Sequence, residues 1–355
     1  MDKKKDQRVE LCRIIACIMV IAIHINLSYV IDGKVIANRL LWSCLCADAV
    51  SVFWIISGFF IYKRFNYKHI LKRTIISICI PLFLINLLYL FFYDGGGSAG
   101  IKEIIKNVLL LRNPISEMYH LWYMYLYIFI MIISPLIYRF ILIMNNYKAI
   151  KKVFFVISLL LLIINDSIHN KLGFANSTLH GFIPAIFLNI YGYYLYGYLN
   201  KESKRKRIMP VILTILFMLV LFFRFLLLNK NLTLDIEDNS LLFWYSSFGL
   251  ALPIILVSLI FEIGANINGK LKLFIIYIAN TCFGIYIIHL PIINFIHKKY
   301  IYCWLENKIG FNVMTDVVYT TLTVSVVFSL SCILIIVYHA LFRKIKCIVC
   351  KLMKI

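Results

Sequence analysis

Two side chains near the start of the chain have the types needed for anion binding and acid–base chemistry. Arg13 and His24 are eleven residues apart, close to three turns of an α-helix, so they share a face about 16 Å apart along the axis. A guanidinium binds phosphates, and an imidazole exchanges protons near neutral pH. The alternatives are a snorkelling interface residue for Arg13 and, for His24, a structural hydrogen bond to a neighbouring helix.

Other ionisable residues lie inside, or at the start of, later apolar stretches. They are Asp48, His120, Arg224 and His289. Inside a membrane such groups are costly unless they are paired or hydrated, so each needs a partner. We expect Asp48 to lie at the depth of His24 on the next helix, where its carboxylate would orient the imidazole. The alternative is that Asp48 faces the outer headgroups.

The composition requires a membrane around these groups. Of the 355 residues, 62% are hydrophobic and 15% are charged, and the mean hydropathy is +0.88. A soluble chain of this length cannot hide so much apolar surface. The net charge of +21 would suit nucleic acid, but the basic residues lie in short loops between apolar runs. We therefore expect the lipid bilayer, and no nucleic acid, as a partner.

The apolar residues form about ten runs, each able to cross roughly 30 Å of hydrocarbon. The runs cover residues 11–31, 42–62, 74–93, 121–143, 153–168, 181–200, 208–229, 241–264, 273–297 and 314–341. These runs predict an all-α, polytopic membrane protein, with residues 1–355 forming a single integral-membrane domain. The fifth run is the shortest, and no internal repeat is visible.

The Lys and Arg residues give the runs a direction. They concentrate at both termini and in the even-numbered loops, most clearly in 201–207, whereas the odd-numbered loop 229–240 is acidic. The positive-inside rule therefore predicts that both termini are cytoplasmic. Arg13 then lies near the cytosolic surface. One layer in the outer half holds His24, Asp48, His120, Arg224 and His289.

Further residues flank these two layers. At the cytosolic face, Lys72 and Arg73 precede the third run and can form an anion site with Arg13; the alternative is ordinary positive-inside charge. Beside His120, the rings of Trp122 and Tyr123 also fit an interfacial aromatic belt. No metal site is expected, because the CxxC near the C-terminus is by itself weak evidence for one.

Several segments resemble the acyltransferase type 3 family, bacterial membrane O-acyltransferases that modify surface and secreted glycans. The resemblance covers nearly the whole chain, although Trp54 stands where the family usually has a second Phe. The matching segments are Arg13 and His24 in the pattern R-x10-H, residues 53–59, Lys72-Arg73 with Pro81, residues 120–123 and residues 286–289.

The resemblance implies an enzyme of the bacterial plasma membrane that moves a short acyl group, with acetyl favoured, from cytosolic acyl-CoA to a hydroxyl of an extracytoplasmic glycan. His24 would be the general base or a transient acyl carrier, oriented by Asp48. Arg13, Lys72 and Arg73 would hold the phosphates of acetyl-CoA. Substrate contacts would come from His120, Trp122, Tyr123, Arg224 and His289.

Two other functions stay open at this point. Some family members are the membrane part of serine racemases, which is thought to handle amino-acid uptake, so a carrier for a small polar solute such as serine is an alternative. Carriers often show discontinuous helices at matching positions in two halves, and the sequence shows no such symmetry. A non-catalytic membrane anchor is a third possibility, which the buried ionisable residues disfavour. The sequence predicts no oligomeric state.

Overall fold

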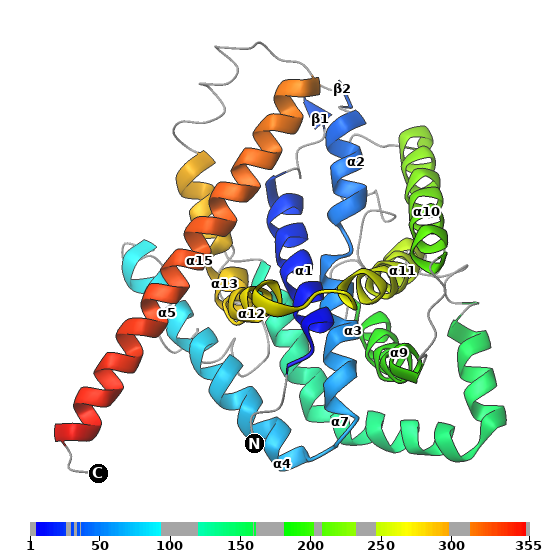
Figure 1. Cartoon of the computed structure of the whole chain (residues 1–355), viewed down its shortest axis with the longest axis horizontal. Coiled ribbons are helices and arrows are strands. Elements are labelled where there is room, and N and C mark those ends of the chain that lie inside the picture. Colours follow the sequence, from blue (N-terminus) through cyan, green and yellow to red (C-terminus); the bar gives the residue numbers. More distant parts are fainter. Residues whose placement is uncertain are drawn as a thin grey trace. The chain divides into compact units, whose positions relative to one another are not determined.

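The computed structural model is helical over most of the residues that it describes (Figure 1). It describes residues 5–25, 30–31, 34–35, 37–93, 120–158, 160, 181–201, 208–231, 246–297 and 313–352. Within these ranges the only strands are β1 (Val30–Ile31) and β2 (Lys34–Val35), which pair antiparallel. The prediction of an all-α fold is therefore confirmed, apart from this two-residue ladder.

The chain divides into two compact units, which we describe separately. The first comprises Met1–Phe53, Lys204–Trp244 and Leu252–Ile355, and the second comprises Trp54–Ser203 and Tyr245–Ala251. The boundaries fall inside α3 (Ala49–Ile61) and α11 (Ser247–Gly264). That residues 1–355 act as one integral-membrane domain stays a prediction.

Helix α1 packs against most other helices of the first unit, namely α2, α12, α13 and α15. Small residues such as Cys12, Ala16 and Cys17 are buried along α1, and small side chains let helices approach closely in a membrane. The helices that lie wholly in this unit are α1 (Gln7–Ile25), α2 (Ala37–Cys46), α10 (Met209–Asn231), α12 (Gly269–Ala279), α13 (Cys282–His297) and α15 (Val313–Leu352).

The second unit is built around α7, which packs against α4, η1 and α9. Its elements are α4 (Tyr67–Thr74), the π-helix η1 (Ile75–Cys79), α5 (Ile80–Tyr93), α7 (Trp122–Asn146) and α9 (Phe182–Lys201), with the larger part of α3. The π-turn ends two residues before Pro81. Proline has no N–H for the carbonyl four residues earlier, and here the chain widens so that the Ile80 N–H reaches the Ile75 carbonyl.

Among the described residues, six helices are long and apolar enough to cross a membrane, and a bent pair would make a seventh. They are Ala37–Ile61, Tyr67–Asn86, Trp122–Asn146, Met209–Lys230, Ser247–Gly264 and Val317–Ala340, with the pair Gly269–Ala279 and Cys282–Ile296. Ten crossings and cytoplasmic termini remain predictions. The fifth run is helical over 148–158, and residues 161–168 lie outside the described part.

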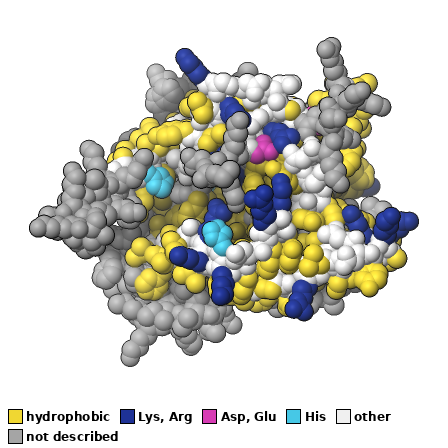
Figure 2. Space-filling view, turned by 60° about the horizontal axis from the view of Figure 1, so that its bottom comes forward, with side chains coloured by type: hydrophobic (Ala, Val, Ile, Leu, Met, Phe, Trp, Pro, Cys, Tyr) yellow, Lys and Arg dark blue, Asp and Glu magenta, His cyan; other side chains and the backbone are white. Residues whose placement is uncertain are grey.

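Much of the exposed surface of the described helices is apolar, as a surface against lipid must be. On α10, for example, Met218 and Leu219 are 59% and 61% exposed. Figure 2 shows hydrophobic side chains over much of one face, with Lys and Arg side chains spread among them. Such a surface is stable only in a bilayer, so the chain is a multi-pass membrane protein.

Two of the apolar spans are interrupted. The run predicted at 42–62 starts earlier, at Ala37, and breaks at Ala47–Asp48 between α2 and α3. The run predicted at 273–297 is bent by 59° between α12 and α13. At this bend the Asn280 side chain accepts a hydrogen bond from Lys5, next to the start of α1.

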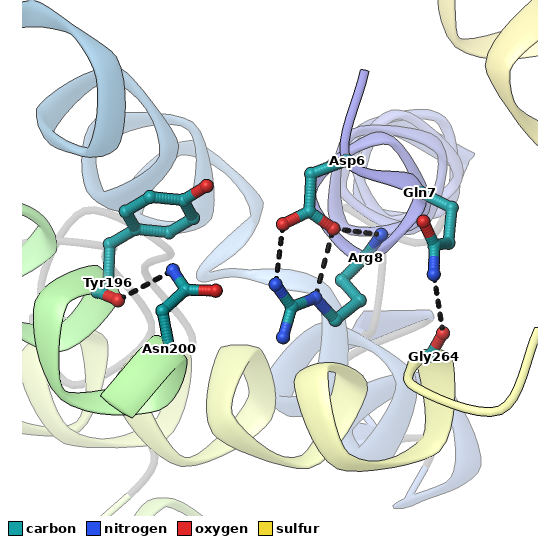
Figure 3. Close-up of polar contacts among 6 residues, drawn as sticks. All are labelled: Asp6, Gln7, Arg8, Tyr196, Asn200 and Gly264. Carbon is teal, nitrogen blue, oxygen red and sulfur yellow. Dashed lines mark hydrogen bonds and ion pairs between the residues drawn. The ribbon is translucent and has the colours of Figure 1, made fainter. Parts of the chain in front are cut away.

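Helix α1 begins at a polar clasp (Figure 3). The Asp6 carboxylate accepts the backbone N–H of Arg8 at 3.0 Å and the Arg8 guanidinium at 2.9 and 2.7 Å, while the Gln7 amide donates to the Gly264 carbonyl at 3.5 Å. Asp6 is thus a helix N-cap that also forms an ion pair. Burial opposes its ionisation, but the hydrogen bonds and charge of Arg8 outweigh burial and lower the pKa of this carboxyl.

Two glycines let α3 and α9 touch backbone to backbone in the second unit. A Cβ on Gly58 would collide with the backbone of Asn189, and a Cβ on Gly192 would collide with the backbone of Ile55. Because neither obstacle is a flexible side chain, α3 and α9 could not stay this close if either glycine were replaced by a residue with a Cβ.

We expect Gly58→Ala and Gly192→Ala each to lower stability, since overpacking costs about 1–3 kcal/mol even where side chains can move. Gly197→Ala, also on α9, is the matched control because a Cβ there meets nothing within 4 Å. Thermal unfolding in detergent measures the effect. Equal melting temperatures for all three variants would contradict the close approach.

The Asp6 clasp predicts a pH-dependent contribution to stability. Its pKa is lower in the folded state, so its contribution is present above the unfolded-state pKa of about 3.9 and is lost as pH falls through the folded-state pKa. Asp6→Asn should therefore lower the melting temperature at pH 7, and the gap to wild type should narrow below about pH 4. A gap that is constant with pH would argue against the ion pair.

Candidate active site

Helices α1 and α13 of the first unit run parallel and in register. The Cys17 thiol donates to the Cys282 carbonyl at 3.3 Å. Seven residues further along both helices, the rings of His24 and His289 lie with centroids 5.2 Å apart and planes tilted by 38°. Two histidines that the sequence placed only at a common depth are therefore direct neighbours.

The tautomer of His289 follows from its surroundings. Its ring is fully buried, and Nδ1 lies 2.7 Å from the Tyr286 carbonyl oxygen and 3.3 Å from that of Ile285. A carbonyl oxygen only accepts, so Nδ1 carries the proton. In the neutral ring Nε2 is then the acceptor, and the helix itself holds the imidazole in one orientation.

His24 differs from His289 in accessibility. It lies in the last turn of α1 and is half-buried. A substrate can therefore reach His24 more readily than His289. This pairing of a reachable imidazole with a fixed one is an arrangement suited to proton transfer.

Two aromatic rings pack in sequence behind His289 and support the histidine pair. The Tyr286 ring lies 5.8 Å from the His289 ring, and Phe53 meets Tyr286 edge to face at 6.2 Å. Phe53 also packs on the small core of Cys17 and Cys282. Phe53 and Tyr286 entered the sequence analysis only as parts of matching segments, because nothing in either residue type signals that it supports a histidine.

Asp48 does not pair with His24, and the expected Asp48–His24 contact was wrong. Its Oδ2 instead accepts a hydrogen bond from Arg224 Nη1 at 2.8 Å, and Oδ1 has no hydrogen-bond partner among the described residues. Both side chains are buried, so the carboxylate and the guanidinium neutralise each other where water is excluded. A common depth on neighbouring helices did not determine which way each side chain points.

Arg13, the expected phosphate-binding residue, forms an ion pair on its own helix. Its Nη1 donates to Glu10 Oε2 at 2.8 Å; the Glu10 side chain is 4% exposed and that of Arg13 is 29% exposed. An anion can therefore reach Arg13, whose guanidinium Glu10 holds in place. Sequence reasoning missed Glu10, although its i,i+3 spacing from Arg13 is a recognised signal of a helical ion pair.

The other predicted site residues lie in the second unit. Lys72 and Arg73 are exposed in the last turn of α4, where they precede η1. His120 is buried two residues before the start of α7, and the Trp122 and Tyr123 rings meet edge to face at 6.3 Å. Tyr123 is itself buried against Trp54, with centroids 4.7 Å apart. Their roles toward substrates stay predictions.

Metal ligation has no support in the described part of the chain. There, no group of three or more His, Cys, Asp or Glu residues could hold a metal ion. The side chains of the CxxC pair Cys347 and Cys350 lie outside the described part.

The apolar spans and the paired histidines define a multi-pass membrane protein with acid–base groups in its interior. The chain belongs to the acyltransferase type 3 family, because the family model described as "Acyltransferase domain" matches residues 6–340. The protein is thus a membrane acyltransferase, as its resemblance to this family indicated. No curated protein matches the chain. No solved structure matches it either.

Proposed function

We propose that this acyltransferase moves a short acyl group, with acetyl favoured, from cytosolic acyl-CoA to a hydroxyl of an extracytoplasmic glycan. We further propose the bacterial plasma membrane as its location. The observation that carries the proposal is the His24–His289 pair, with rings 5.2 Å apart, on two helices of an acyltransferase chain. Acyl transfer to a hydroxyl needs one group that takes a proton and later returns it, and His24 fits that role.

In the proposed step the acceptor oxygen attacks the thioester carbonyl while His24 takes the hydroxyl proton. The tetrahedral intermediate collapses, the C–S bond breaks, and the imidazolium returns the proton to the thiolate, so the products are an ester and free CoA. Positioned proton transfer of this kind contributes about 10²–10⁴-fold to a rate. In the alternative route His24 carries the acyl group itself as an acyl-imidazole.

The tautomer of His289 limits the roles that this residue can have in the reaction. Because Nδ1–H is committed to the Tyr286 carbonyl, a neutral His289 offers only the acceptor nitrogen Nε2. It can accept a hydrogen bond from the acceptor hydroxyl or from His24, but it cannot donate one to an oxyanion. This favours a role in binding the acceptor over oxyanion stabilisation. We assign Asp48 no direct proton transfer in this step, because its carboxylate is bonded to Arg224.

The donor would enter from the cytosolic side. Arg13 lies three turns before His24 on the same helix, a spacing that lets a phosphate group bind at Arg13 while the acyl end reaches His24. For the second unit we retain Lys72 and Arg73 as proposed phosphate contacts. His120, Trp122 and Tyr123 are retained as proposed contacts to the substrate.

A carrier for a small polar solute such as serine is the second candidate. The interrupted spans α2–α3 and α12–α13 favour it, because carriers often build their sites from discontinuous helices. Uptake of labelled serine into vesicles in the absence of any acyl donor would support the carrier. Acyl transfer without such uptake would support the enzyme.

We expect His24→Ala to abolish acylation at an unchanged level of folded protein, because the proton acceptor is removed. Mass spectrometry of surface glycans in cells that express each variant measures this. His339→Ala, the same substitution at an exposed position of α15, is the control. Acylation that persists in His24→Ala would reject the catalytic role, and an acyl-His24 adduct trapped in wild type would select the covalent route.

Arg13→Ala should raise KM for acyl-CoA about tenfold or more, since hydrogen bonds to charged groups contribute ~1.5–3 kcal/mol. KM for the acceptor should change little. Steady-state kinetics in proteoliposomes with both substrates varied separates the two, and Arg139→Ala, which removes an exposed charge from α7, is the control. A larger effect on the acceptor than on the donor would rule out the phosphate contact.

A further inference from the structure

The break between α2 and α3 lies inside an apolar span. Helical hydrogen bonding runs up to Ala47, whose N–H donates to the Ser43 carbonyl at 2.9 Å, and resumes where the Val52 N–H donates to the Asp48 carbonyl at 3.2 Å. Carbonyls in the last turn of α2 therefore need other donors. In hydrocarbon no water can supply them, so a break at this depth persists only if the protein satisfies it.

Arg224 of α10 supplies such a donor and bridges the break. Its Nη1 carries two protons, and that nitrogen donates to the Cys44 carbonyl at 3.0 Å and to Asp48 Oδ2 at 2.8 Å. Cys44 belongs to the last turn of α2, and Asp48 directly precedes the first turn of α3. One guanidinium nitrogen thus holds both halves of the interrupted span.

The electrostatics of the two helix ends favour the same arrangement. The C-terminal end of a helix carries a partial negative charge and the N-terminal end a partial positive charge. The Arg224 cation lies at the end of α2, and the Asp48 anion lies at the start of α3. Each charge therefore faces both its partner and a helix end of opposite sign, in a setting where both side chains are buried.

A chain of contacts leads from this break to the histidines. Phe53 follows Asp48 by five residues in α3 and meets Tyr286 edge to face at 6.2 Å. Tyr286 supplies the carbonyl that accepts the His289 Nδ1–H, and the His289 ring lies 5.2 Å from His24. If α3 started in another direction, Phe53 would leave Tyr286 and the histidine pair would lose its support.

We propose that Asp48 and Arg224 are positioning residues, which clamp the α2–α3 break and thereby hold Phe53, Tyr286 and His289 in place beside His24. The inference rests on the proposed function of the histidine pair. It replaces the expectation that Asp48 orients His24 directly and that Arg224 binds substrate.

The test measures kcat, KM for both substrates and thermal stability for four variants: Asp48→Asn, Arg224→Gln, the double variant D48N/R224Q, and Arg224→Lys. Each single neutral substitution should lower kcat by roughly 100-fold with little change in either KM, because slight misplacement of reacting groups has effects of that size. The double variant leaves no unpaired buried charge, and its two amide side chains can still bridge the break by hydrogen bonds, so kcat should recover to within about tenfold of wild type. Arg224→Lys keeps the positive charge, so its kcat should lie between those of wild type and Arg224→Gln. Lys230→Gln, an exposed change on α10, is the control.

Phe53→Leu tests the same pathway without altering a charge, should a clamp variant fail to fold. It should fold and lower kcat about tenfold, with KM unchanged, because it removes only the ring contact to Tyr286. Wild-type kcat in Phe53→Leu would overturn the proposal. So would a raised KM in the Arg224 variants, or a double variant as slow as Asp48→Asn. Wild type and His24→Ala are measured in the same series to separate the clamp from the proposed function. Equal acyl-transfer rates for these two proteins would reject the proposed function. The clamp would then be judged by thermal stability alone, and it requires the double variant to be more stable than Arg224→Gln.

Discussion

The hydrocarbon core of a bilayer offers no water to a backbone group or a charge, and this constraint shapes the buried polar contacts of the described helices. A guanidinium, a carboxylate and a helix-end carbonyl therefore meet at Arg224, Asp48 and Cys44. The same pressure gives His289 its tautomer, because the carbonyl oxygens available to its Nδ1 belong to its own helix. Polar groups that would be solvated separately in water are here forced into contact, and contact provides orientation.

Helix α1 carries several of these polar groups at fixed spacings. Along one helix it carries the N-cap Asp6, the ion pair of Glu10 and Arg13, and the reachable imidazole of His24. Its buried face includes small side chains, among them Cys17 at the contact with α13, so α13 can pack closely enough to bring His289 alongside. The proposed anion-binding and proton-transfer residues are thereby joined by one helix, so a group bound at Arg13 would have a defined reach to His24.

The hydropathy of the sequence predicted where most helices lie, since runs of apolar residues report directly on solvent. It also singled out His24, Asp48, Arg224 and His289, because ionisable residues stand out in such runs. The hydropathy could not show which of these residues are in contact. The depth of a residue in the membrane follows from its position along a helix, but its contact partners depend on how each helix is rotated about its own axis. The breaks at Ala47–Asp48 and Asn280–Thr281 were missed as well, because no glycine or proline marks either of them. Glu10 was overlooked since it precedes the first apolar run.

The in-register contact of α1 and α13 joins residues that are 265 positions apart. During synthesis His24 is made early, whereas His289 follows roughly 15 to 50 seconds later at the usual ~5–20 residues per second. The histidine pair thus comes into being only once most of the chain has been made and inserted. A ribosome that stalls before α13 releases a fragment that holds the first imidazole but not the second. The histidine pair therefore forms late in synthesis, after α1 to α12 have been made, and only α15 among the described helices follows it.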